Sequence, residues 1–283
     1  MPLIDDIRAK AKTRVARVVF PEMDDPRVKE AASLIEADGL AQAMALSDLT
    51  EAQIAALVAA RGMKETVARR MLAKPMIRAA AMVGAGEADA MVAGVDTPTR
   101  KVIEAAGLGI GLAEGVSLPS SLFLMSFPDG RDLIFADCAL NIAPDAEGLA
   151  AIAIASAQSA RALLGDARVA MLSFSTGTSG IGASVDLVRE AAEIAGFPGP
   201  VQADAALNAQ IAARKGIESD DANVLVFPSL DAGNIAYKLC QELAGAQALG
   251  PVLQGFCKPV CDLSRGASVD DIVAATAVAL ALG

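Results

Sequence analysis

The sequence predicts an α/β protein whose β-sheets are mainly parallel. Short apolar runs alternate along the chain with longer, Ala-rich segments of helical length, which is the order of repeated strand–helix–strand units. Hydrophobic residues make up 54% of the sequence but aromatic residues only 3%, so Ala, Val, Leu and Ile must form the core, as they do around buried parallel strands. The 283 residues are many for one core, so we expect two domains, with a single large α/β unit as the alternative.

The first third of the chain contains three predicted strands. We predict strands at residues 15–20, 41–46 and 88–95, and helices at residues 26–39, 50–61, 64–83 and 100–106. Asp25 as N-cap, Pro26 at the first helical position and Gly39 as terminator frame the first helix. Pro75 should kink or split the long helix, because proline lacks the backbone donor and clashes with the preceding turn.

The pattern changes between residues 120 and 140. Two apolar runs are joined there by Pro128, Asp129, Gly130 and Arg131, a sequence typical of a hairpin turn. We therefore expect an antiparallel pair of strands inside an otherwise parallel chain, and we interpret this pair as the sign of a domain junction.

The rest of the chain repeats the strand–helix alternation. We predict strands at residues 167–175, 200–207, 222–229 and 251–257, and helices at residues 145–164, 208–215, 231–245 and 269–282. Residues 176–182 form a loop rich in glycine and hydroxyl groups between a strand and a helix. Such loops can cradle phosphate, although this one lacks the lysine of a P-loop and the glycine spacing of a dinucleotide site.

Polar side chains follow five of the predicted strands. They occupy residues 94–100, 137–138, 173–179, 229–234 and 258–265. In an open α/β sheet, ligands bind beyond the carboxyl ends of the strands. The five polar segments together predict a ligand site there, more strongly than any one of them alone.

The densest polar cluster lies between two apolar runs, within residues 259–273. Gly266 allows a tight turn, and Ser268 is suited to cap the helix that follows. A helix N-terminus beside Arg265 could hold a phosphate or carboxylate, with Ser264 as a further donor. Asp271 has two interpretations: it is a carboxylate base, or it is the acid of a capping box with Ser268.

Composition and charge exclude several classes of function. A formal net charge of −10 argues against nucleic-acid binding, which requires a basic face. The chain has no histidine, which excludes a Ser-His-Asp triad and a His-ligated metal site. The four cysteines form no CxxC pair, and no apolar run is long enough to span a bilayer. We therefore expect a cytoplasmic protein with free thiols, no membrane partner and no metal.

Several segments match a known family. They are VVFPEMDDPRVKEAA, GEADAMVAG, FADCALN, LSFSTGTSG, VQADAAL, ANVLVFPSLDAGNIAYKLCQELAGAQALGPVLQGFCKPV and DLSRGASVDDIV. With these segments the chain resembles the phosphate acetyltransferase family, which includes the phosphate butyryltransferases. The resemblance covers most of the chain, and its most specific part runs from Asn223 to Val273.

The resemblance implies two α/β/α domains with an inter-domain cleft, usually paired as a homodimer. It places the first domain at residues 1–121 plus 251–283 and the second at residues 122–250. The family's catalytic serine, arginine and aspartate match Ser264, Arg265 and Asp271, and its cleft cysteine matches Cys138. Further candidates for substrate binding are Ser175, Thr176, Gly177, Ser179, Asn234, Lys238, Thr97 and Arg100.

The implied reaction moves an acetyl group between acetyl phosphate and coenzyme A, both of them substrates, without a cofactor or metal. A free thiol titrates near ~8.5, so coenzyme A needs a base, and a carboxylate in a low-dielectric cleft is a stronger one. We expect Asp271 to take the thiol proton, Arg265 to hold the phosphate and Ser264 to donate to the developing oxyanion. Two alternatives remain open: the same chemistry on a butyryl chain, and a non-catalytic domain that senses acetyl-CoA.

Overall fold

The computed structural model describes residues 2–217 and 221–283, and these fall into two compact units. The first unit contains the described residues up to Ser117 together with Gly250–Gly283, and the second is Leu118–Leu249. The junctions therefore follow Ser117 and Leu249, whereas the sequence expectation placed them after residues 121 and 250.

The first unit is built on a sheet with the strand order β2-β1-β3-β9-β8. Its strands are β1 (Arg17–Val19), β2 (Gln42–Met44), β3 (Ala90–Ala93), β9 (Val260–Asp262) and β8 (Gln247–Gln254), whose first three residues belong to the second unit. β1 pairs in parallel with β2 and with β3, and β3 pairs in parallel with β9. Only β8, antiparallel to β9, breaks this pattern, so the predicted α/β fold with a mainly parallel sheet is confirmed.

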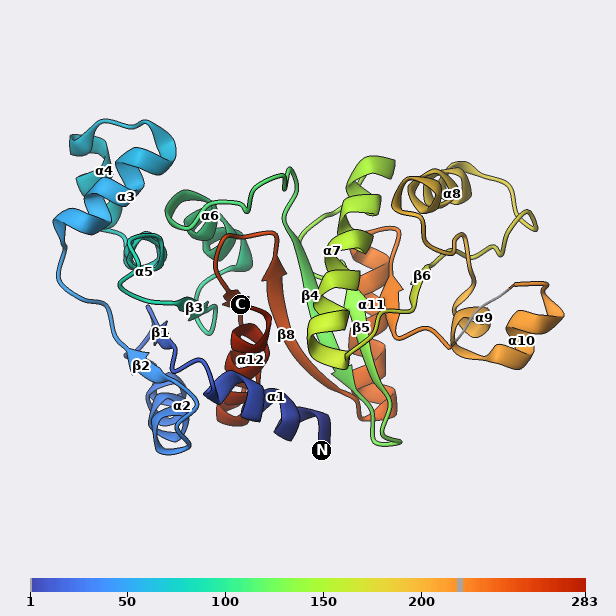
Figure 1. Cartoon of the computed structure of the whole chain (residues 1–283), viewed down its shortest axis with the longest axis horizontal. Coiled ribbons are helices and arrows are strands. Elements are labelled where there is room, and N and C mark those ends of the chain that lie inside the picture. Colours follow the sequence, from blue (N-terminus) through green and yellow to red (C-terminus); the bar gives the residue numbers. More distant parts are fainter. Residues whose placement is uncertain (1, 218–220) are drawn as a thin grey trace. The chain divides into compact units, whose positions relative to one another are not determined.

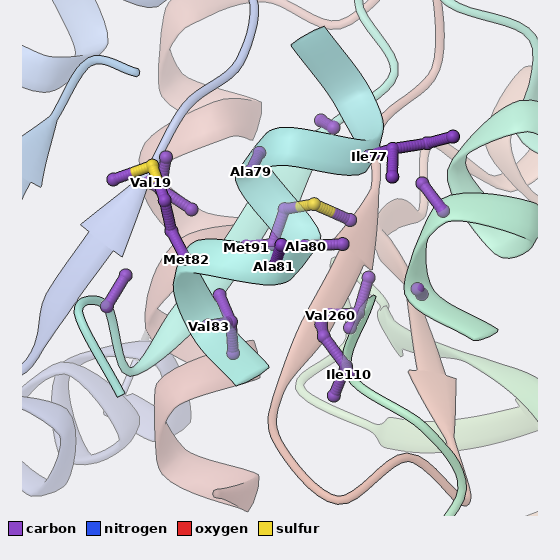
Figure 2. Close-up of a cluster of buried hydrophobic side chains, with 14 of the residues drawn as sticks. Val19, Ile77, Ala79, Ala80, Ala81, Met82, Val83, Met91, Ile110 and Val260 are labelled. Atoms are coloured by element: carbon purple, nitrogen blue, oxygen red, sulfur yellow. The ribbon is translucent and has the colours of Figure 1, made fainter. Parts of the chain in front are cut away.

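Helices cover both faces of the first unit's sheet (Figure 1). One face carries α1 (Pro2–Lys12), α2 (Pro26–Ala37) and α12 (Val269–Leu282), and the other carries α3 (Glu51–Arg61), α4 (Glu65–Leu72), α5 (Pro75–Gly84) and α6 (Thr99–Gly109). Helix α12 packs against α1 and α2, while α5 packs against α3, α4 and α6. Figure 2 shows the core around α5, where Val19, Met91 and Val260 from three strands are fully buried.

Local sequence signals account for most of the first unit's elements. Pro75 splits the predicted helix 64–83 into α4 and α5, and the Asp25 side chain accepts the cap hydrogen bond from the Arg27 N–H. Helix α1 was missed, and β8 begins earlier than the predicted strand 251–257. The Gly250–Pro251 pair inside β8 has the composition of a turn, which explains why the strand was predicted to begin after it.

The second unit contains a sheet segment of order β4-β5-β7-β6. Its strands are β4 (Ser120–Ser126), β5 (Asp132–Ala136), β6 (Val169–Met171) and β7 (Val224–Val226). β4 and β5 form the predicted antiparallel hairpin, with Phe123 opposite Phe135. β7 lies between β5 and β6 and is parallel to both.

Helices pack on both sides of the second unit's strands. They are α7 (Ala146–Leu164), α8 (Ala183–Ala195), α9 (Ala203–Leu207), α10 (Ala209–Arg214) and α11 (Leu230–Ala244). Helix α7 contacts all four strands and packs against α8, and Figure 1 shows it in front of β4 and β5 with α11 behind them. On the α11 side, the rings of Phe123 and Tyr237 stack with centroids 4.2 Å apart.

The strand predicted at residues 200–207 is wrong. Val201 forms only a single bridge to Leu172, and the backbone turns into α9 at Ala203. Pro200 has no N–H to donate to a ladder, and the Ala-rich sequence that follows favours helix.

Candidate functional site

The turn between β9 and α12 presents two exposed polar side chains, Ser264 and Arg265. The Ala267 N–H donates to the Ser264 carbonyl at 2.9 Å, and the Gly266 N–H donates to Ser264 Oγ at 3.3 Å. The Arg265 guanidinium has no hydrogen bond or ion pair with the described residues of its own unit. Its donors are therefore free for an anion such as phosphate.

Asp271 sits at the third position of α12 and forms a capping box with Ser268. The Asp271 N–H donates to Ser268 Oγ at 3.2 Å, while the Ser268 N–H and hydroxyl both donate to Asp271 Oδ2, at 3.0 and 2.8 Å. The capping interpretation is thus confirmed. Both bonds end on Oδ2, so Oδ1 is without a partner in the described part of the unit, and a role as base stays a prediction.

Asp262, the last residue of β9, is a buried carboxyl that the sequence analysis did not assign to the site. It is 1% exposed, and its Oδ2 accepts a 2.6 Å hydrogen bond from the Thr99 hydroxyl. Oδ1 is buried and has no partner among the described residues. Burial raises the pKa of Asp262 from 3.8 to about 7, the Thr99 bond opposes this rise, and the charge of Glu22 adds to it.

The loop after β3 lies directly against the end of β9. At Gly94, with φ of +113°, a Cβ atom would lie 2.5 Å from Asp262 Oδ1 and 2.6 Å from the Leu263 carbonyl oxygen, so this approach requires glycine. The Glu22 carboxylate accepts hydrogen bonds from the N–H groups of Gly94, Val95 and Asp96 at 2.6, 3.1 and 3.0 Å. No local pattern marks Glu22, because its partners lie 72 to 74 residues away in the sequence.

Thr97 and Arg100 flank the start of α6. The N-cap is Pro98, and no side chain caps this helix, so Thr97 is not the cap. Arg100 is exposed in the first turn. The threonine that reaches the β9 end is Thr99. Contacts of Thr97 and Arg100 with phosphate or coenzyme A stay predictions.

Cys138 follows β5 in the second unit and is fully buried. Burial raises the pKa of its thiol well above the ordinary value, and the neighbouring Asp137 carboxylate adds to the rise. Asp137 itself accepts hydrogen bonds from the Ser121 hydroxyl, from the Asn141 side chain and from three backbone N–H groups. The raised pKa favours the protonated thiol, which is a poor nucleophile.

Asn234 and Lys238 lie on α11 and have protein partners of their own. The Asn234 Nδ2 donates to the Cys138 carbonyl at 3.0 Å, so this amide fixes the cysteine's backbone. The Lys238 ammonium lies 4.9 Å from the centroid of the Tyr237 ring. Gly233 makes the approach of α11 close, because a Cβ there would lie 2.9 Å from the Cys138 Sγ.

In the loop predicted to cradle phosphate, several hydroxyl and N–H donors are already hydrogen-bonded within the protein. The Ser175 and Ser179 hydroxyls lie 3.0 Å apart, and the Thr176 N–H donates to Ser179 Oγ at 3.1 Å. The Gly177 N–H donates to the Pro200 carbonyl at 2.9 Å. Thr176, Gly177 and Ser179 line a pocket of about 500 Å³. Their contact with substrate stays a prediction that these internal hydrogen bonds do not favour.

No three His, Cys, Asp or Glu side chains in residues 2–217 and 221–283 cluster as ligands of a metal ion would. None of the helices in that part of the chain has the length and apolar content needed to cross a membrane.

Comparison with known proteins identifies the family. A family model described as Phosphate acetyl/butaryl transferase matches residues 47–280 of the chain. A curated phosphate acetyltransferase from Paracoccus denitrificans is 41% identical, and the match covers 98% of this chain and 98% of that protein. The chain belongs to the phosphate acetyl/butaryl transferase family. The resemblance drawn from its sequence segments is confirmed.

Other relatives of the phosphate acetyl/butaryl transferase family differ in length. The curated phosphate acetyltransferase of Haemophilus influenzae is 40% identical over 93% of this chain, but the chain spans only 42% of that protein. The crystal structure of a phosphotransacetylase from Streptococcus pyogenes is 34% identical and superposes with a TM-score of 0.91. That match covers 99% of this chain and 97% of the other, so the family fold extends over nearly all of the sequence.

Proposed function

We propose that the protein is an acyltransferase that reversibly transfers an acetyl group between acetyl phosphate and coenzyme A. Family membership and the end-to-end match to a phosphate acetyltransferase from Paracoccus denitrificans support the reaction class. The structural observation that carries the proposal is the Ser264–Arg265 turn, where an exposed guanidinium with no partner among the described residues of its unit adjoins an exposed hydroxyl. Such a pair suits the binding of a phosphoryl group whose charge grows as it leaves.

The reaction follows from the chemistry of three side chains in the first unit. Arg265 binds the phosphoryl oxygens of acetyl phosphate, and Asp271 takes the thiol proton of coenzyme A on Oδ1, the oxygen not used by the capping box. The thiolate attacks the acetyl carbonyl, and a C–S bond forms. The C–O bond to phosphate then breaks, its electron pair stays on the phosphate oxygen, and Arg265 neutralises the charge while Ser264 donates to the developing oxyanion.

The proposed roles of residues in the second unit are contacts with substrate, and none of these residues takes part in the chemical step. Cys138 is proposed as a lining residue for the acyl group, since its raised pKa keeps it a thiol. Five further residues are proposed to contact substrate only after exchanging hydrogen bonds made within the unit: Ser175, Thr176, Gly177, Ser179 and Asn234. Lys238, whose ammonium lies over the Tyr237 ring, is proposed as a sixth contact. The scheme assigns every step to protein side chains and therefore includes no metal. Coenzyme A enters as a substrate and is not counted as a cofactor.

Consumption of the coenzyme A thiol, followed with acetyl, propionyl and butyryl phosphate, tests the proposal. We expect phosphate-dependent turnover that is fastest with acetyl phosphate. Faster turnover with butyryl phosphate would assign the chain to the longer acyl group. Binding of acetyl-CoA without turnover of any acyl phosphate would contradict catalysis and indicate a sensing domain.

We further propose that the protein acts as a homodimer in the cytoplasm. Helix α11 carries an apolar stripe at the spacing of one helix face: Ile235, Leu239 and Leu243 are 57%, 51% and 81% exposed. Exposed apolar stripes of this kind mark protein–protein contacts. All four cysteines are free thiols, which suits a reducing compartment.

A further inference from the structure

Arg27, in the first turn of α2, reaches the turn that carries Ser264 and Arg265. Its Nη1 donates to the carbonyl oxygen of Arg265 at 2.8 Å and to that of Ala267 at 3.1 Å. The two hydrogen bonds span sequence separations of 238 and 240 positions. The two carbonyls flank Gly266, so one side chain fixes the backbone on both sides of the residue where the chain turns.

The same guanidinium binds two other groups. Its Nη2 donates to the carbonyl oxygen of Val95 at 3.3 Å, and Nη2 and Nε donate to the two carboxylate oxygens of Asp25 at 2.8 and 3.1 Å. A guanidinium has five N–H donors, and these bonds, with the two to the turn, use all of them. Arg27 therefore has no donor left for a phosphate, whereas the guanidinium of Arg265 has no partner within the described residues of its unit.

Val95 connects Arg27 to the loop before α6. The Val95 N–H donates to Glu22 at 3.1 Å, so Glu22 and Arg27 hold the two sides of this residue. Thr97 and Arg100, both candidates for substrate contact, follow in the same segment. The first unit's two segments with predicted substrate contacts are thus fixed to a single cation.

Asp25 keeps this cation in place. As N-cap of α2 it accepts from the Arg27 N–H at 2.8 Å and also pairs with the guanidinium. The side-chain hydrogen bond from Arg27 lowers the pKa of Asp25, so the carboxylate stays charged at neutral pH. We infer that Arg27 is a positioning residue, which sets the geometry of Ser264 and Arg265 without touching substrate. The inference rests on the proposed acyl transfer.

Arg27→Lys tests this role, because an ammonium has three donors and cannot reproduce the planar set of five. We expect kcat with acetyl phosphate and coenzyme A to fall about 10- to 100-fold, since small displacements of catalytic groups cost this much. The urea midpoint of Arg27→Lys should stay close to that of the unaltered protein although its kcat falls. Added methylguanidinium should restore part of the activity of Arg27→Ala, which a loss of folding would not allow.

Arg17→Lys is the matched control. Arg17 also binds a carboxylate through two nitrogens, at 3.0 Å each to Asp89, and a backbone carbonyl, that of Gly86 at 2.9 Å. It lies in the same unit but bonds neither the turn nor the loop before α6. We expect its turnover to match that of the unaltered protein. Equal losses in Arg27→Lys and Arg17→Lys, or none in either, would overturn the positioning role.

Hydrogen exchange separates this inference from the proposed function and serves if Arg27→Ala fails to fold. Arg27→Lys should accelerate amide exchange at residues 264–268 relative to Arg17→Lys, whether or not the protein turns over an acyl phosphate. Unchanged exchange there would sink the inference while leaving the acyl transfer intact. Absence of turnover in the unaltered protein would sink the acyl transfer, and with it the catalytic meaning of Arg27.

Discussion

The Thr99 hydroxyl donates a 2.6 Å hydrogen bond to Asp262 Oδ2, while Oδ1 of the same carboxyl is buried and has no partner in the described part of the chain. The bond ties the first turn of α6 to the end of β9, two residues before Ser264. A carboxyl that is half satisfied and 1% exposed resists ionisation. Its protonation therefore couples the stability of the first unit to pH.

Asp262→Asn should change the pH dependence of stability. Folding raises the pKa of this carboxyl from 3.8 to about 7. Its contribution to the unfolding free energy is therefore complete below pH 3.8 and is lost as the pH rises through about 7. The Asn side chain can still accept from Thr99 but cannot ionise. Between about pH 5 and about pH 8, the unfolding free energy of the variant should gain about 2 kcal/mol relative to the unaltered protein. Urea unfolding at both pH values measures this difference, and parallel pH profiles would contradict it.

Gly94→Ala should disrupt the contact between the loop after β3 and the end of β9. The added Cβ would meet Leu263 backbone atoms at 2.6 and 2.7 Å, and a backbone cannot yield as a flexible side chain can. Gly86→Ala is the control, since Gly86 also has positive φ but no atom within 4 Å of an added Cβ. We expect the control to cost about 1 kcal/mol of unfolding free energy, and Gly94→Ala clearly more. Equal urea midpoints for the two variants would show that the contact is not tight.

Asp271→Asn separates the two roles of this residue. The amide oxygen can still accept from the Ser268 N–H, so α12 should keep most of its cap while turnover falls about 100-fold or more. Ser268→Ala has the opposite character: it should cost about 1 kcal/mol of stability and leave the carboxylate in place. Steady-state rates and thermal melts of both variants decide the matter. Near-normal turnover of Asp271→Asn would leave Asp271 as a cap only.

Cys138 should resist alkylation. Its thiol is fully buried, and burial raises its pKa, so few thiolates form and few reagent molecules reach them. Cys257 is exposed and provides the internal comparison. With iodoacetamide, mass spectrometry of digested protein should find Cys257 modified well before Cys138. Modification of Cys138 at the same rate would show an accessible, reactive thiol.

Leu239→Glu should weaken the proposed dimer. The substitution places a charge in the middle of the α11 stripe, where an apolar partner surface would have to desolvate it. Ile194→Glu on α8 is the control, because Ile194 is 51% exposed but lies outside the stripe. Light scattering should show a loss of dimer for Leu239→Glu alone. A monomer for the unaltered protein at micromolar concentration would contradict the proposal.

Local chemistry explains which elements could be predicted. Pro75 ends one helix and begins the next, and Ser268 caps α12. Both signals act between residues that are close together in the sequence, so the interacting partners can be recognised from the sequence itself. The strand expected at residues 200–207 failed because Val201 alone bridges Leu172 before the Ala-rich segment turns helical.

The candidate site was predictable only in part, for the same reason. Ser264 and Arg265 stand in a compact polar segment, and the structure leaves both exposed. Their supports come from far along the chain: Arg27 bonds residues more than two hundred positions away. The raised pKa of Asp262 arises from burial, and this burial depends on the packing of the loop after β3 at Gly94. The residues next to Asp262 in the sequence do not indicate it.

The second unit interrupts the first in the sequence, and this has a consequence for synthesis on the ribosome. Strand β3 must wait for its neighbour β9 until the whole of Leu118–Leu249 has been translated. Until then the edge of β3 on which β9 will pair stays open in the nascent chain. The Ser264–Arg265 turn, which follows β9, can therefore take its final form only when almost the whole chain has left the ribosome.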